Sequence, residues 1–91
     1  MDQLVNQVAH WTPARWAAGG AGDRVHALAQ RLADLGADAE QREHRPVPRL
    51  DSDLALPDQV RVLAADLLAA DPPPGVLAAA LDAVRHARAG L

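Results

Sequence analysis

Apolar residues recur along most of this chain with the period of an α-helix. The longest such stretch runs from Asp23 to about Glu43, directly after the turn-forming run Gly19-Gly20-Ala21-Gly22. At about 100° per residue its apolar side chains share one stripe: Val25, Leu28, Ala29, Leu32, Leu35, Gly36 and Ala39. A short acidic side chain such as Asp23 favours a helix start. We therefore predict a central helix with one face to bury, in which Gly36 lets a neighbouring helix approach closely.

The residues before this helix predict a broken helical segment. In a first helix from Asp2 to about Trp11, one face is shared by Leu4, Val8 and Trp11, with Val5 on its flank. Thr12-Pro13 then indicates a restart, because Thr is a good N-cap and Pro a good first helical residue. The short helix that follows, Pro13 to Ala18, should stop at the glycine pair.

The second half of the chain predicts two further helices. The stretch from His44 to Leu56 carries Pro46 and Pro48, and we expect an ordered crossover held by apolar residues: Val47, Leu50, Leu54 and Leu56. A third helix starts at Pro57 or Asp58, runs to about Ala70, and buries Val60, Leu63, Ala64, Leu67 and Leu68. The fourth, Gly75 to about Ala89, buries Val76, Leu77, Ala80, Leu81, Val84 and Ala87.

These elements predict one all-α domain over residues 1–91. The architecture is a small four-helix bundle with a short broken first segment and a Pro-containing crossover between helices two and three, the last two helices forming an antiparallel hairpin.

Composition changes this picture in one respect. The chain has no Phe, Tyr or Ile, so its core is built from Leu, Val and Ala with two Trp. Small side chains bury little area each, and a 91-residue chain allows only a modest core. We therefore expect self-association to contribute to stability.

Charge and residue usage exclude several classes of function. The net charge of −3 argues against general nucleic-acid binding, which needs a basic surface. The absence of Cys excludes disulfides and thiolate chemistry. The sequence contains neither a run long enough to span a membrane nor a signal-peptide pattern. We expect a cytoplasmic protein without a membrane partner.

The two Trp residues and one exposed Val are the candidate partner-binding residues. Trp11 and Trp16 flank Arg15, and Trp and Arg dominate binding hot spots. The alternative is structural: Trp11 as the largest core residue and Trp16 as a cap on the end of the bundle, with Trp16 the more exposed of the two. Val62 points away from the apolar stripe of its helix, which favours a contact with a partner.

The titratable residues do not form a recognisable catalytic or metal motif. Three pairs have helical spacing, namely Asp23–His26, Glu40–His44 and Asp82–His86. Zinc sites need three or four convergent ligands, and these pairs come from separate segments. The sequence therefore predicts neither an enzyme nor a bound metal or cofactor.

One short motif supports a different class. Asp51-Ser52-Asp53-Leu54 resembles the modification site of the acyl carrier proteins, which are also small, acidic, four-helix domains. Their phosphopantetheine Ser follows an Asp and precedes a Leu at the start of a helix. In this chain Asp53 intervenes between Ser52 and Leu54. The resemblance implies phosphopantetheine attachment at Ser52, whereas a turn or capping role is the structural alternative.

From the sequence we expect a non-catalytic accessory or regulatory module that binds another protein or itself. The alternative is a carrier protein modified at Ser52.

Overall fold

All regular elements in the described part of the chain are helical, which confirms the predicted all-α fold. The computed structural model describes residues 4–5, 11–48 and 53–90. Its α-helices are α2 (Pro13–Ala17), α3 (Ala21–Ala39), α4 (Leu56–Ala69) and α5 (Pro74–Ala89). Two short 3-10 turns, η1 (Ala18–Gly20) and η2 (Asp53–Ala55), precede α3 and α4 respectively.

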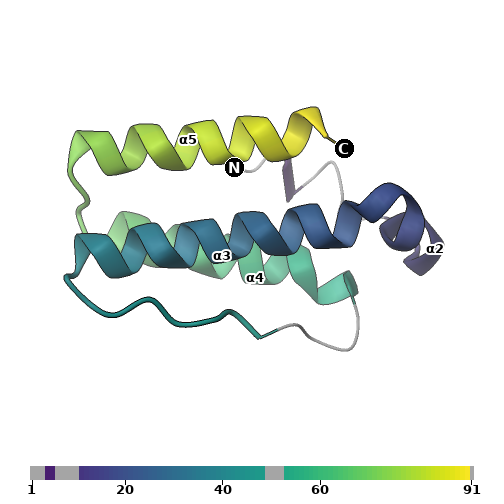
Figure 1. Ribbon diagram of the computed structural model, residues 1–91, viewed down its shortest axis with the longest axis horizontal. Coiled ribbons are helices and arrows are strands. Elements are labelled where there is room, and N and C mark those ends of the chain that lie inside the picture. Colours follow the sequence, from purple (N-terminus) through teal and green to yellow (C-terminus); the bar gives the residue numbers. More distant parts are fainter. Residues whose placement is uncertain (1–3, 6–10, 49–52, 91) are drawn as a thin grey trace.

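Helix α3 is the centre of the bundle. Both α4 and α5 pack against it, and α2 lies across its start and on η2 (Figure 1). The largest side chains that are fully buried are those of Leu4, Val5, Trp16, Val25, Leu32, Leu56 and Val60. Leu4 and Val5 are helical, as predicted, and the rest of the expected first helix up to residue 10 lies outside the described residues. Helices α4 and α5 run antiparallel as expected, but they contact each other much less than either contacts α3.

The junction between α2 and α3 follows the predicted local chemistry. The Thr12 hydroxyl accepts a hydrogen bond from the Arg15 backbone N–H at 3.3 Å, as an N-cap should. Gly19 and Gly20 have φ of 62° and 73°, left-handed values that end the short helix. Helix α3 begins at Ala21, two residues before the expected start, so Asp23 lies in its first turn. There its charge still complements the positive end of the helix.

The end of α3 differs from the prediction, because the helix stops at Ala39 rather than near Glu43. Gln41 adopts a φ of 58°, and the Arg42 N–H donates to the Ala37 carbonyl at 2.7 Å. This is a Schellman-type ending, which satisfies the last carbonyls of the helix. Just beyond this ending, Arg42 forms an ion pair with Glu40 at the surface.

The crossover is held to α3 mainly through polar groups. Gln30 accepts a hydrogen bond from the Val47 N–H at 2.7 Å and donates one to the Arg45 carbonyl at 3.0 Å. His26 Nε2 lies 3.0 Å from the Val47 carbonyl, to which it donates. Val47 is half-buried as expected, Leu50 lies outside the described residues, and Leu54 is 50% exposed. The apolar contacts predicted to hold this segment are therefore only part of its attachment.

Three side-chain expectations are wrong. Leu68 and Leu81 were expected in the core and are 64% and 55% exposed. Each lies about 100° around its helix from a buried neighbour, and the sparse contact between α4 and α5 leaves these flanks uncovered. Gly36 is buried, but a methyl group placed on it would meet no atom within 4 Å, so no neighbouring helix approaches closely there.

No helix in the described ranges combines the length and the apolar character that crossing a membrane requires.

Candidate interaction sites

The structure brings Trp11, Arg15 and Trp16 together, as the sequence suggested. The two ring centroids lie 5.1 Å apart with the ring planes tilted by 59°. The Arg15 guanidinium carbon sits 4.6 Å from the centroid of the Trp11 ring, within the range of a cation–π contact. Trp11 is thus covered by Arg15 on one side and by Trp16 on another.

The exposures of the two Trp are the reverse of the expected order. Trp16 is only 1% exposed and belongs to the core, whereas Trp11 is half-buried. Because α2 lies across the start of α3 and on η2, a large side chain from its last turn closes that end of the bundle. The surface that this corner offers to a partner is therefore made by Trp11 and Arg15 alone.

The exposed apolar side chains are concentrated on one segment. Four large apolar residues in the described ranges are at least half exposed, and three of them, Leu54, Val62 and Leu68, belong to η2 and α4. Ala65 and Ala69 are exposed on the same helix. We call these five residues the α4 face. Val62 was identified from the sequence, and the structure adds the other members.

A shallow apolar pocket lies beside Val62. It has a volume of about 490 Å³ and is bounded by α4, by Ala33 of α3 and by Pro46, Val47 and Pro48 of the crossover. Gln59 closes it by donating from Nε2 to the Pro48 carbonyl at 3.1 Å. The polar attachment of the crossover to α3 therefore also shapes the surface next to Val62.

The histidines bind carboxylates and carbonyls in a pattern that the sequence spacing did not predict. His44 pairs not with Glu40 but with Asp38, at 2.6 Å from Nε2, and with Asp34, at 3.7 Å from Nδ1. The hydrogen bond to Asp38 is the main reason that the pKa of His44 is raised from 6.5. Within the described residues no group of three or more His, Asp or Glu has a geometry suited to a metal ion.

Ser52 lies outside the described residues, directly before the helical residues that start with Asp53. A groove between α3 and α5 contains Arg24 and Arg31 of α3, which the sequence analysis did not single out. Their seven-residue spacing, about two helical turns, is the sequence signal that places them on one face of the helix.

Comparison of the chain with protein-family models, with curated proteins and with solved structures finds no match.

Proposed function

We propose that this protein is a non-catalytic helical module that binds protein partners through the α4 face, with a second copy of itself as the first partner. The supporting observation is the concentration of exposed Leu54, Val62 and Leu68 on one segment. Contiguous exposed apolar surface commonly marks an interaction site. The small core adds a thermodynamic reason, since covering this face buries apolar area that the monomer leaves in water.

The chemistry of the interior supports a binding role over a catalytic one. In the described ranges every buried residue is either apolar or glycine. Catalytic sites usually hold polar or titratable groups in a partly buried, pre-organised arrangement. The polar side chains found here instead fasten the crossover, cap α2 or pair at the surface.

Light scattering on a sizing column, measured over a range of protein concentrations, tests this proposal. We expect the wild type to form a dimer or a larger species. Val62→Glu and Leu68→Glu should each raise, at least tenfold, the protein concentration that is needed for this association. Leu81→Glu is the matched control, because Leu81 is 55% exposed but lies on α5. Circular dichroism verifies that all three variants keep their helical content.

Two results would overturn the proposal. A wild-type monomer at every concentration would remove self-association. An equal response to Leu81→Glu and Val62→Glu would show that the α4 face has no special role.

One observation supports the alternative hypothesis of a carrier protein modified at Ser52. The described residues from Asp53 through α4 are helical, and Ser52 precedes them in the sequence, in keeping with the position of the modified Ser at a helix start in the acyl carrier proteins. Incubation with a phosphopantetheinyl transferase and coenzyme A, followed by intact mass measurement, tests it. Modified wild type and unmodified Ser52→Ala would establish a carrier, whereas an unchanged wild-type mass would exclude that function.

A further inference from the structure

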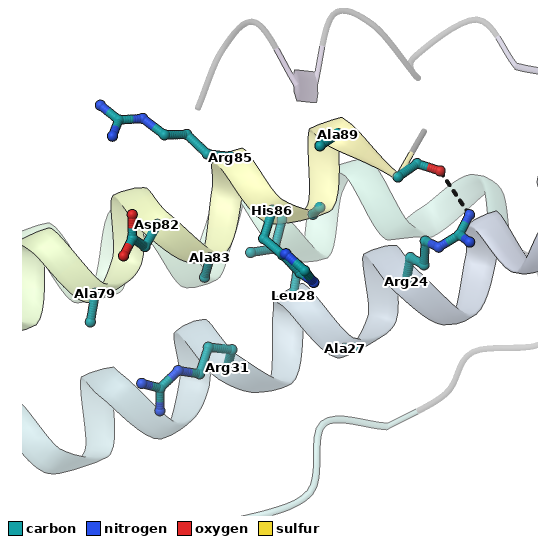
Figure 2. A pocket seen from close by; sticks show the side chains of 12 residues that line it. Arg24, Ala27, Leu28, Arg31, Ala79, Asp82, Ala83, Arg85, His86 and Ala89 are labelled. Carbon is teal, nitrogen blue, oxygen red and sulfur yellow. Dashed lines mark hydrogen bonds between the residues drawn. The ribbon is translucent and has the colours of Figure 1, made fainter.

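A long groove runs between α3 and α5, on surfaces that do not include the α4 face (Figure 2). Its volume is about 1190 Å³. Small apolar residues from both helices form its floor, with Ala27 and Leu28 on α3 and Ala79 and Ala83 on α5. Side chains this short allow another helix to come close, since interaxial distances fall toward about 8 Å where the contact residues are small.

The charged residues of this groove are mostly cationic, although the chain as a whole carries a net charge of −3. Arg24, Arg31 and Arg85 line it together with His86, and Asp82 is the one acidic residue among the described residues of its lining. Figure 2 shows Arg24 and Arg31 extending from α3, whereas Arg85 extends from the outer side of α5. The groove therefore has a local charge opposite to that of the protein.

Arg31 lacks a carboxylate partner for an identifiable reason. Asp34, one turn further along α3, accepts a hydrogen bond from Gln30 at 2.9 Å and faces His44 at 3.7 Å. Across the described residues Arg31 forms no hydrogen bond or ion pair. Arg24 uses Nη1 to donate to the Gly90 carbonyl at 2.7 Å, which leaves its remaining N–H groups for another acceptor.

The spacing of these two arginines selects the kind of anion. Arg24 and Arg31 are seven residues apart on one helix, which places their Cα atoms about 10.5 Å apart along its axis. One phosphate could pair with both guanidinium groups only if the two side chains turned toward a common point. Two carboxylates at positions i and i+7 of a second helix have the same separation and would face both guanidinium groups, which bind carboxylates well.

We propose that the groove between α3 and α5 binds an acidic amphipathic α-helix of a partner protein. The apolar stripe of that helix lies on Ala27, Ala79 and Ala83, and two of its Asp or Glu residues, seven positions apart, pair with Arg24 and Arg31. This inference extends the proposed interaction function to a second surface and a second kind of partner.

A pair of synthetic peptides of about 20 residues tests the proposal. One carries an Ala/Leu stripe flanked by two Glu seven positions apart, and the other has Gln at those two positions. Titration into the ¹⁵N-labelled full chain, followed by NMR, should show the Glu peptide shifting the amides of Ala27, Ala79 and Ala83. The Gln peptide should bind at least tenfold more weakly.

Protein variants separate the groove from general electrostatics. Arg31→Glu should weaken binding of the Glu peptide at least tenfold, and a peptide with Lys in place of only the Glu that faces residue 31 should restore it. Arg61→Glu is the matched control, because it makes the same change of charge at an exposed arginine on α4, and it should leave affinity unchanged.

The proposal fails if neither peptide binds, or if Arg31→Glu and Arg61→Glu have equal effects. It also fails if inorganic phosphate displaces the Glu peptide completely while shifting the same amides, since that would indicate a simple anion site. Val62→Glu should not change peptide binding, so loss of self-association and loss of groove binding are measured independently.

Discussion

The backbone N–H of Val47 donates a hydrogen bond to the side-chain oxygen of Gln30, 17 residues earlier in the chain, at 2.7 Å. His26 binds the carbonyl of the same residue, so both backbone polar groups of Val47 are satisfied by side chains of α3. An irregular segment has no helical or sheet partner for these groups, and buried backbone groups are costly when unpaired. Gln30 and His26 thus replace the missing secondary structure.

Gln30→Leu should lower the free energy of unfolding by about 1–3 kcal/mol, because it leaves a part-buried donor and an acceptor unpaired. Amide hydrogen exchange at Val47 should also become faster in this variant than in the wild type, while exchange in the helices changes less. Gln59→Leu is the control, since it removes a hydrogen bond to Pro48 but none to Val47. Unchanged protection of Val47 in Gln30→Leu would show that apolar contacts alone hold the crossover.

The burial of the two Trp predicts very different costs of truncation. Trp16→Ala should lower the free energy of unfolding by about 3–5 kcal/mol, the usual range for a large side chain removed from a core. Trp11→Ala should cost less, because Trp11 is only half-buried against the core. It loses part of an apolar contact together with its ring and cation–π contacts, the last two worth about 1–2 kcal/mol. Urea denaturation followed by circular dichroism measures both. A larger loss for Trp11→Ala would contradict the placement of Trp16 in the core.

Gly36→Ala should raise the free energy of unfolding by about 0.5–1 kcal/mol, because Ala is the better helix former and the new methyl group meets nothing within 4 Å. Gly20→Ala provides the contrast. Its surroundings are equally open, but its φ of 73° is left-handed, so the substitution should destabilise by about 1–2 kcal/mol. The midpoint temperatures of thermal unfolding should therefore rise for Gly36→Ala and fall for Gly20→Ala.

Sequence patterns predict the features of this fold that depend on neighbouring residues, but not those that depend on contacts between distant segments. Helices, the Thr12 cap and the glycine stop depend on neighbours within a few positions, and they were predicted closely. The exposure of Leu68 and Leu81 depends on how far α4 and α5 contact each other, which their own periodicity does not specify. The binding of Val47 by Gln30 is likewise a long-range match, because a Gln on the polar side of a helix looks the same with or without a partner.

The same limitation applies to the candidate sites. Local spacing brought Trp11, Arg15 and Trp16 together correctly, since they lie within two turns of chain. Their order of burial was wrong because α2 crosses the end of the bundle. The groove could not be predicted from α3 alone, because it forms only where α3 packs against α5. That packing places Arg24 and Arg31 along the groove.

His44 should titrate above its ordinary pKa of 6.5, because the protonated ring is held by Asp38 and Asp34. A pKa that is higher in the folded than in the unfolded state stabilises the fold when the group is protonated. This contribution is therefore fully present below pH 6.5 and is lost as the pH rises through the raised pKa. An NMR titration of the imidazole should show that Asp38→Asn returns the pKa toward 6.5, and Asp34→Asn should have a smaller effect. An unchanged pKa in Asp38→Asn would contradict the hydrogen bond.

The turn that follows α3 offers a stabilising substitution. Gln41 has a φ of 58°, a conformation that costs a residue with a side chain about 1–2 kcal/mol and glycine almost nothing. Gln41→Gly should therefore raise the free energy of unfolding by about 1 kcal/mol, despite the greater freedom that glycine has in the unfolded chain. Glu40→Gly is the control: Glu40 has a φ of −96°, so glycine relieves no strain there and should destabilise or have no effect. Urea denaturation of the two variants decides the matter, since equal responses at the adjacent positions would mean that the left-handed turn after Ala39 does not form in solution.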